Sequence, residues 1–453
     1  MADVVVLGAG IAGHTAALNL KKMLGRKHRV TVVSPNSHWN WIPSNIWVGV
    51  GEMERDEVVF PLAPVYRKHG IEYRQAKAVA IRPHGDAESD RGAVDVVSTA
   101  GQDAGAEDRI RYDFLINATG PKLRFEATEG LGPEAGNTHS VCTADHATGA
   151  SAALQAAIER MRAGERLTLV VGMGHGTCTC EGAAFEYTFN VDAALRAAGV
   201  RDRARLIYLT NESELGDFGV GGMTFVEHGF ETNSSLWTGS LFRERGVEPI
   251  LGAHVEKVEP DVIHYETLDG EHHTLRYDFA MLLPPFGGQP LKAYDRDGAD
   301  ITEQLFAPSG FMKVDADYTQ KPYEEWRAED WPETYQAVGL DNVWAVGIAF
   351  APPHPISRPR KSPAGTVIAP SPPRTGMPSG VMAKTVAHTI ADRIKHGPSA
   401  AAHQASMARM GAACVASAGA GLRQDTAATM TMLPNVPDYQ RYRTGRALDR
   451  TAG

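Results

Sequence analysis

The chain has 453 residues, enough for two or three domains with sizeable hydrophobic cores. Hydrophobic residues make up 43% and charged residues 22%, which is the composition of a soluble globular enzyme. The formal net charge of −9 argues against nucleic acid as a partner, because such a partner requires a clustered basic face. No apolar run has the length of a transmembrane helix, and Asp3 leads directly into an apolar run, so we expect neither a membrane span nor a signal peptide.

The first 34 residues have the pattern of a dinucleotide-binding unit. Residues 4–7 are apolar and mostly β-branched, which predicts a buried strand, and a helix over 14–23 and a second strand over 29–34 follow. The turn between the first strand and the helix reads G-x-G-x-x-G, with glycines Gly8, Gly10 and Gly13. In this context the glycines permit a tight turn, close approach of a pyrophosphate and close packing of helix on strand. We therefore predict a dinucleotide at the N-terminus of the helix, rather than a turn that only packs.

One feature departs from this pattern. An acidic residue is expected at the end of the second strand, where it binds the ribose hydroxyls. Ser34 occupies that position and is followed by Pro35 and Asn36. The ribose contact is therefore weaker than usual or comes from elsewhere in the chain.

Residues 38–51 contain three tryptophans, a proline and two glycines, which predicts an irregular loop. Such an aromatic loop beside a dinucleotide site either walls a flavin ring or fills a hydrophobic gap, and we favour the first. Further on, residues 112–120 predict a strand that ends in the turn Ala118-Thr119-Gly120. In flavoproteins with two dinucleotide folds, a turn of this kind marks the crossing into the second domain.

The second domain repeats the opening pattern in a damaged form. Residues 167–171 predict a strand before a glycine turn, 181–198 a helix and 206–209 the next strand. Thr177 replaces the third glycine of the fingerprint, and Thr210 replaces the ribose-binding acid, although Glu212 and Glu214 lie close to it. We interpret this domain as an inherited fold that no longer binds a nicotinamide nucleotide.

The four cysteines are too few for a disulfide framework in a chain of this length. Cys180 stands at the start of the expected helix over 181–198, where the helix N-terminus favours a thiolate. It is therefore suited to nucleophilic sulfur chemistry. By their local sequence alone, Cys142 and Cys414 are better explained as small buried apolar residues.

The chain resembles the sulfide:quinone oxidoreductases, membrane-associated flavoproteins of the two-dinucleotide-fold disulfide reductase superfamily. The resemblance extends from Asp3 to about Pro434. It rests on these stretches of the sequence: 43–51, 118–123, 140–147, 180–187, 347–349 and 373–377, with Cys414 ahead of 430–434.

The resemblance implies an α/β fold with two Rossmann-like dinucleotide-binding domains in tandem and a C-terminal segment. The expected boundaries are 1–120 with 286–398 for a discontinuous FAD-binding domain, 121–285 for the second domain with its degenerate nucleotide site, and 399–453 for a segment that carries the third cysteine. Within the first domain, we expect a buried strand over 342–349 and a helix that starts near Gly376 and runs to Lys395.

The resemblance also assigns the chemistry. Cys180 and Cys414 are the pair beside the flavin, joined directly or through extra sulfur; sulfide attacks this bridge and the released thiolate reduces the FAD. Cys142 assists sulfur transfer, whereas Cys178 has no counterpart in the family. Electrons pass to a quinone, ubiquinone or menaquinone, and the product is polysulfide or sulfur.

Two further residues are implied in proton handling, Glu186 as a carboxylate near the flavin and His146 as a shuttle. The expected FAD-binding residues are Gly8, Gly10, Gly13, Ser34, Pro43, Ser44, Asn45, Thr119, Gly120, Gly347, Ile348, Arg374 and Thr375. The flavin is expected to be noncovalent, because Trp41 stands where a related protein has a cysteine. No metal site is predicted.

Departures from the family concern the surroundings of the flavin and the tail. Asp217 stands in place of a second histidine, Arg374 in place of a lysine, and residues 352–372 resemble an insertion. The tail over 438–453 has four arginines and few apolar residues, so we expect a peripheral, weak and salt-sensitive contact with a membrane surface. The sequence leaves open the side of the membrane and whether the chain forms a homo-oligomer.

Three rival functions remain open. One is the flavoprotein subunit of flavocytochrome c sulfide dehydrogenase, which passes electrons to a cytochrome, although the absence of C-x-x-C-H means that a haem would need a partner subunit. The others are a type II NADH dehydrogenase and a flavin-stabilised relay protein without turnover.

Overall fold

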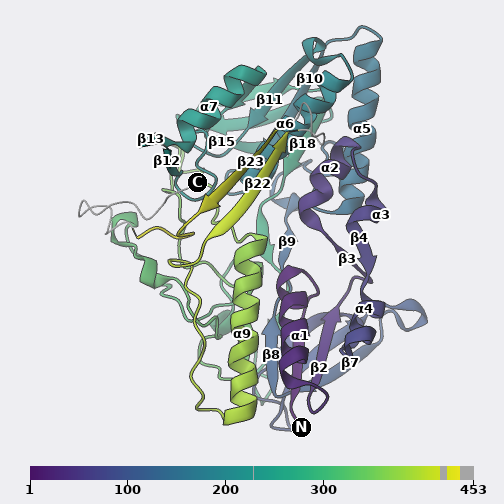
Figure 1. Cartoon of the computed structure of the whole chain (residues 1–453), viewed down its shortest axis with the longest axis vertical. Coiled ribbons are helices and arrows are strands. Elements are labelled where there is room, and N and C mark those ends of the chain that lie inside the picture. The colour runs from purple at the N-terminus through teal and green to yellow at the C-terminus, as the bar shows by residue number, and fades with distance from the viewer. Residues whose placement is uncertain (228, 419–425, 439–453) are drawn as a thin grey trace.

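The structure is a computed structural model of the whole chain, and it describes residues 1–227, 229–418 and 426–438. A mixed sheet and a fully parallel sheet, each with helices packed against it, lie at opposite ends of an elongated molecule (Figure 1). This confirms the α/β fold class predicted from the repeated strand-turn-helix pattern.

The first sheet contains the N-terminal strands in the order β21-β8-β1-β2-β5-β6-β7, and β20 pairs with β5. Its strands are β1 Asp3–Leu7, β2 Arg29–Ser34, β5 Glu72–Arg82, β6 Gly92–Ser98, β7 Glu107–Tyr112, β8 Phe114–Asn117, β20 Lys292–Ala293 and β21 Val343–Ala345. The five residues of β1 are all buried, as expected for a central strand covered on both faces. Helix α1 (Ile11–Leu24) packs beside α9 (Gly376–His396), so segments more than 350 residues apart form one layer over this sheet (Figure 1).

The second sheet is fully parallel, in the order β14-β11-β10-β18. Its strands are β10 Leu167–Met173, β11 Ala204–Leu209, β14 Val247–Ile250 and β18 Phe279–Leu283. The helices of this part are α5 Ala144–Arg162, α6 Glu181–Ala197 and α7 Ser234–Arg245. The strand, turn and helix predicted between 167 and 198 are therefore confirmed, with the third element of the repeat at β11.

The remaining strands form small antiparallel sheets. They are β3 His38–Asn40 with β4 Val59–Pro61, β9 Pro121–Leu123 with β19 Phe286–Gly288, β12 Thr224–Glu227 with β13 Phe230–Asn233, β15 Ala253–Val258 with β16 Val262–Thr267 and β17 His272–Arg276, and β22 Ala412–Ala418 with β23 Thr426–Met432. The shorter helices are α2 Asn45–Val50, α3 Arg55–Val58, α4 Leu62–His69 and α8 Thr302–Leu305.

The prediction of an irregular loop over 38–51 is wrong. This stretch forms β3, a 3₁₀ turn over Ile42–Ser44 and helix α2, which ends at Gly51 with a left-handed φ of 85°. Gly49 lets α2 pack closely, because a Cβ there would lie 2.8 Å from both Val141 and Tyr187. Tertiary packing thus imposes a helix on a sequence whose local composition argues against one.

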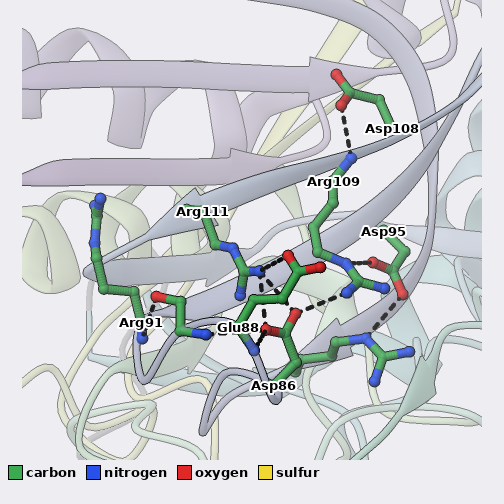
Figure 2. Close-up of polar contacts among 9 residues, drawn as sticks. Asp86, Glu88, Arg91, Asp95, Asp108, Arg109 and Arg111 are labelled. Atoms are coloured by element: carbon green, nitrogen blue, oxygen red, sulfur yellow. Dashed lines mark hydrogen bonds and ion pairs between the residues drawn. The ribbon is translucent and has the colours of Figure 1, made fainter.

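A network of arginine–carboxylate pairs stabilises the β5-β6-β7 edge of the first sheet (Figure 2). Asp86 accepts hydrogen bonds from Arg109 at 2.7 Å and from Arg111 at 2.9 Å. Arg111 is the main cause of the lowered pKa of Asp86. Asp86 is itself buried, so the pairs satisfy a charge that the fold has removed from water.

Among the residues that the structure describes, none of the helices is both long enough and apolar enough to span a bilayer. The tail arginines, from which we predict a weak membrane contact, lie in 439–453, outside the described residues.

Candidate active site

The first glycine turn has the tight geometry that a dinucleotide site requires. Gly8 has a left-handed φ of 95°, and a Cβ there would lie 2.2 Å from the carbonyl oxygen of Ala118. Gly10 is different: it is exposed, it caps α1, and no protein atom lies within 4 Å of where its Cβ would stand. The turn is therefore closed on the protein side and open at the helix N-terminus, the position that receives a pyrophosphate in dinucleotide-binding folds.

Predicted cofactor residues from three distant segments meet at this turn. Thr119 donates to Asn117 Oδ1 from its backbone nitrogen and its hydroxyl, at 3.2 and 2.8 Å, directly after β8. Gly347 has a φ of 66°, and its Cβ would lie 3.0 Å from Ala12 in α1. Gly376, the first residue of α9, similarly faces Ile11. The glycine turn, the end of β8, the 347–349 turn and the start of α9 thus lie next to one another.

The early aromatic segment joins this region to the cysteines. Asn45 is fully buried, and its side-chain nitrogen donates to Asn40 Oδ1 and to the Val141 carbonyl, both at 3.1 Å. Pro43 is exposed and Ser44 is half-buried in the preceding 3₁₀ turn, while Ser34 is buried at the end of β2. Asn45 therefore links the predicted flavin wall to the residue before Cys142.

Arg374 is a buried cation without a carboxylate partner among the described residues. Its guanidinium donates to the carbonyls of Ile348, at 3.2 Å, and Phe350. It also lies over the ring of Phe311, at 4.5 Å from the centroid. Burial lowers the pKa of Arg374 to about 10, and nearby Cys180 in its thiolate form opposes this shift. The guanidinium is thus held by two backbone carbonyls and a phenylalanine ring, close enough to Cys180 for the two charges to interact.

These residues fit a flavin dinucleotide. Arg374 Nε and Thr375 Oγ1 are buried and have no hydrogen-bond partner in the described part of the chain. Buried polar groups are rarely left without a partner, so these two donors indicate a missing acceptor. A flavin ring and its phosphates supply acceptors at the end of a glycine turn, which matches the arrangement here.

Cys180 occupies a special backbone position. It is the N-cap of α6 and has a φ of 73°, one of three left-handed values at residues other than glycine in the described chain. The free N–H groups of the first helical turn and the positive end of the helix dipole lie around it. The structure therefore combines backbone strain, a helix N-terminus and the Arg374 cation at one thiol, an arrangement typical of a functional cysteine.

Cys178 and Cys142 have different environments. Cys178 is fully buried, and its thiol donates to the Leu283 carbonyl at 3.1 Å. Burial raises the pKa of Cys178 well above its usual range, with the Glu181 charge as a second cause. Cys142 is half-buried just before α5, and burial raises its pKa to about 11. Both thiols are therefore held neutral at physiological pH in the resting chain.

Cys414 lies in β22, opposite Met430 of β23, and its side chain is outside the described part of the structure. Strand β22 lies beside α6 (Figure 1), the helix that Cys180 caps. Glu186 on α6 accepts hydrogen bonds from Ser417 of β22, and burial raises its pKa. No local pattern indicates that the two elements meet, because 227 residues separate Asn190 from Ser417.

His146, the other predicted proton carrier, sits in the first turn of α5. Its Nε2 lies 3.4 Å from Glu134 Oε1, and its ring packs edge-on against Phe125. The Nδ1 atom is buried and has no hydrogen-bond partner among the described residues. One ring nitrogen thus lies near an exposed carboxylate and the other is buried, and the role of His146 as a proton carrier stays a prediction.

Sequence reasoning missed a cluster of buried carboxylates directly after Cys180. Glu181 is fully buried, and Glu212 is 1% exposed and accepts hydrogen bonds from Tyr208, Thr210 and the Phe218 backbone at 3.1, 2.9 and 2.9 Å. Burial raises the pKa of Glu212 to about 7 and that of Glu181 well above its usual range. Asp217, with a raised pKa, completes the cluster. The sequence shows one acid at the start of α6 and two in the loop after β11. It does not show that burial raises the pKa of all three.

The second glycine turn is occupied by the protein itself. The backbone nitrogen of Gly176 donates to His254 Nδ1 at 3.0 Å, and the Gly176 carbonyl accepts from Ala369 at 2.9 Å. Ser371 adds hydrogen bonds to the carbonyls of Cys178, at 2.8 Å, and Thr177, at 2.8 Å. One backbone donor of this turn, the Gly176 nitrogen, is therefore already paired, and the segment around Ala369 and Ser371 is hydrogen-bonded to the turn.

Comparison with known proteins agrees with this architecture. A sequence model of the pyridine nucleotide-disulphide oxidoreductases matches residues 2–302, and this is the class that the paired dinucleotide folds define. A sulfide-quinone reductase of Aquifex aeolicus is 30% identical over 416 residues, which cover 92% of this chain and 81% of that protein. The chain belongs to the sulfide:quinone oxidoreductase family of enzymes.

Solved structures extend the comparison. The crystal structure of the sulfide:quinone oxidoreductase from Aquifex aeolicus matches with a TM-score of 0.73 and 27% identity, over 96% of this chain and 85% of that one. The NDH2 protein of Plasmodium falciparum matches with a TM-score of 0.65 over 96% of this chain and 90% of that one, at 12% identity, which shows a shared fold alone.

Proposed function

We propose that the chain oxidises sulfide to polysulfide or sulfur with bound FAD and passes the electrons to a membrane quinone. The observation that carries this proposal is the position of Cys180 at the N-cap of α6, beside Arg374 and next to the strand that contains Cys414. Family membership supports the substrate and the acceptor, since the relative with 30% identity is named a sulfide-quinone reductase.

The sulfur chemistry takes place at a bridge between Cys180 and Cys414. Hydrosulfide attacks one bridge sulfur, the bond between the two cysteine sulfurs breaks, and a persulfide and a thiolate result. When a sulfur–sulfur bond forms again, two electrons leave the sulfur atoms and the persulfide proton is released. FAD, when bound, would supply the two-electron acceptor for this step, and a quinone would be the final acceptor of two electrons and two protons.

The residues of the chain divide the remaining tasks. The N-terminus of α6 and Arg374 stabilise the thiolate form of Cys180 by their positive charge. Glu186 and His146 accept and deliver protons, and Cys142 assists sulfur release. Gly8, Gly10 and Gly13 would hold the pyrophosphate of FAD, and Thr119, Gly347 and Thr375 would hold other parts of the cofactor.

Quinone reduction tests the proposal directly. Purified protein with FAD is mixed anaerobically with sulfide and a short-chain ubiquinone analogue, with cytochrome c alone as the control acceptor. We expect rapid flavin bleaching and turnover with the quinone. Turnover with cytochrome c together with a co-purifying haem protein, and none with any quinone, would refute the quinone assignment.

A further inference from the structure

A single serine fixes the C-terminal hairpin to helix α6. The hydroxyl and the backbone nitrogen of Ser417 donate to Glu186 Oε1 at 2.7 and 2.9 Å. Trp47 Nε1 donates to the Ser417 hydroxyl at 2.8 Å. Asn190 Nδ2 donates to the Ser417 carbonyl at 2.9 Å and lies 3.1 Å from its hydroxyl. Every polar group of Ser417 is thus engaged, and we name these four residues the Ser417 latch.

The order of these hydrogen bonds gives the direction of the strand. The backbone nitrogen of Ser417 meets Glu186, and its carbonyl meets Asn190, which lies one turn further along α6. A peptide nitrogen precedes its carbonyl along the chain, so β22 runs in the same direction as α6 at this point. Residues before Ser417 therefore lie toward the N-terminus of the helix, the end that Cys180 caps.

The two cysteines are equally far from the latch. Cys180 precedes Glu186 by six helical residues, which is about 9 Å at the rise of an α-helix. Cys414 precedes Ser417 by three strand residues, which is about 10 Å at the rise of a strand. The latch therefore brings the backbone of Cys414 level with Cys180.

The described side chains of β22 contribute little hydrophobic packing. They are small: Ala412 and Ala416 are buried, Ala413 is exposed, and Ser417 is 5% exposed. Such side chains remove little apolar area from water and offer little shape by which to set the register of the strand. A buried polar group, by contrast, destabilises the folded chain unless its specific hydrogen-bond partners are in place.

We propose that Ser417 is a positioning residue, which holds Cys414 at the distance from Cys180 that the sulfur bridge requires. Glu186 has a second role in this arrangement, as the acceptor of the latch. The inference rests on the cysteine pair of the proposed function. It adds that the pair is set by a hydrogen-bonded residue outside the two thiols.

The rate at which the Cys180–Cys414 bridge forms tests the role of the latch, and this measurement needs neither sulfide nor quinone. The reduced holoenzyme is oxidised with diamide, which takes two electrons and two protons from two thiols, and the peptide linked through Cys180 and Cys414 is quantified by mass spectrometry over time. In Ser417→Ala we expect the bridge to form at least ten times more slowly than in the unaltered chain. Ser406→Ala is the matched control, since Ser406 is a buried serine of the same C-terminal region that only caps Ala408, and it should bridge within two-fold of the unaltered rate.

A second pair of variants keeps the test decisive if Ser417→Ala fails to bind FAD. Glu186→Gln retains the side-chain oxygen that accepts both hydrogen bonds, so it should bridge at close to the normal rate, whereas Glu186→Ala should be as slow as Ser417→Ala. Normal bridging in Ser417→Ala or in Glu186→Ala would overturn the inference, as would equal slowing in Ser406→Ala or the absence of a Cys180–Cys414 bridge in the unaltered chain. A chain that bridges normally but is not bleached by sulfide would refute the proposed function and leave the latch standing.

Discussion

A Cβ on Gly13 would lie 2.0 Å from the carbonyl oxygen of Gly8, so the first turn of α1 packs directly on the end of β1. No side chain larger than hydrogen fits between these two backbones. The third glycine of the fingerprint is thus required by the fold itself, whereas Gly10, with open space around it, is not. A substitution at Gly13 should therefore affect folding, whereas a substitution at Gly10 should affect cofactor binding.

Gly10→Ala should therefore weaken FAD binding without unfolding the chain. The added methyl group meets no protein atom within 4 Å, and alanine can adopt the φ of −73° at Gly10. The remaining cost is that of a weaker N-cap, on the order of 1 kcal/mol. The methyl group does stand where a pyrophosphate approaches the backbone. We expect FAD affinity at least ten-fold lower by fluorescence titration, with an unchanged circular dichroism spectrum.

Gly13→Ala is the matched comparison. Backbone must move to admit its methyl group, so we expect a loss of stability of at least about 2 kcal/mol. If Gly10→Ala binds FAD normally, the glycine turn is not the pyrophosphate site.

A flavin bleaching assay distinguishes the roles of the cysteines. Cys180→Ser and Cys414→Ser should each abolish bleaching by sulfide while they retain FAD, because neither chain can form the bridge. Cys178→Ser should stay within about two-fold of normal, since a serine hydroxyl can donate to the Leu283 carbonyl in place of the thiol. An active Cys180→Ser beside an inactive Cys178→Ser would show that the nucleophile is two residues earlier.

NADH should leave the flavin oxidised. The second glycine turn is paired with His254 and covered by the segment around Ala369 and Ser371, so a nucleotide would have to displace these contacts. The measurement is anaerobic absorbance after NADH, with sulfide as the positive control. Bleaching by NADH at a rate comparable with sulfide would favour a type II NADH dehydrogenase instead.

The flavin should be bound without a covalent link. Trp41 is 45% exposed and stacks on Trp39, so the early segment offers no thiol at this position. Acid precipitation should release all of the yellow chromophore into the supernatant. Colour that stays in the pellet after repeated washing would contradict this expectation.

The buried carboxyl group of Glu212 should make the stability of the folded chain depend on pH. Burial raises its pKa from an ordinary value of 4.5 to about 7. Between these two pH values the unfolded chain ionises at Glu212 and the folded chain does not, so the folded state loses up to about 3 kcal/mol as the pH rises. Glu212→Gln should therefore unfold at a higher temperature than the unaltered chain at pH 8, with little difference near pH 4.5.

Scanning calorimetry at the two pH values measures this effect. Glu214, exposed on the same loop, provides the control substitution Glu214→Gln, which should show no pH-dependent gain. An equal gain for Glu212→Gln at both pH values would mean that its carboxyl group is not kept neutral by the fold.

The sequence by itself determined the strand-turn-helix units at 3–34 and 167–198, because apolar period and glycine spacing are local signals. It also predicted the helix that starts at Gly376 and, through motif resemblance, the family of the chain. It failed at α2, where a helix forms because Val141 and Tyr187 close around Gly49.

Only the tertiary structure decided how distant segments meet. The strand AACVASA has no strong local preference, and it becomes β22 because β23 pairs with it and Ser417 finds Glu186, Trp47 and Asn190. Likewise, the acids Glu181 and Glu212 have raised pKa values only because the fold removes them from water. Hydrogen-bond partners more than 200 residues apart and the desolvation of a charge are properties of packing, which no local pattern of residues records.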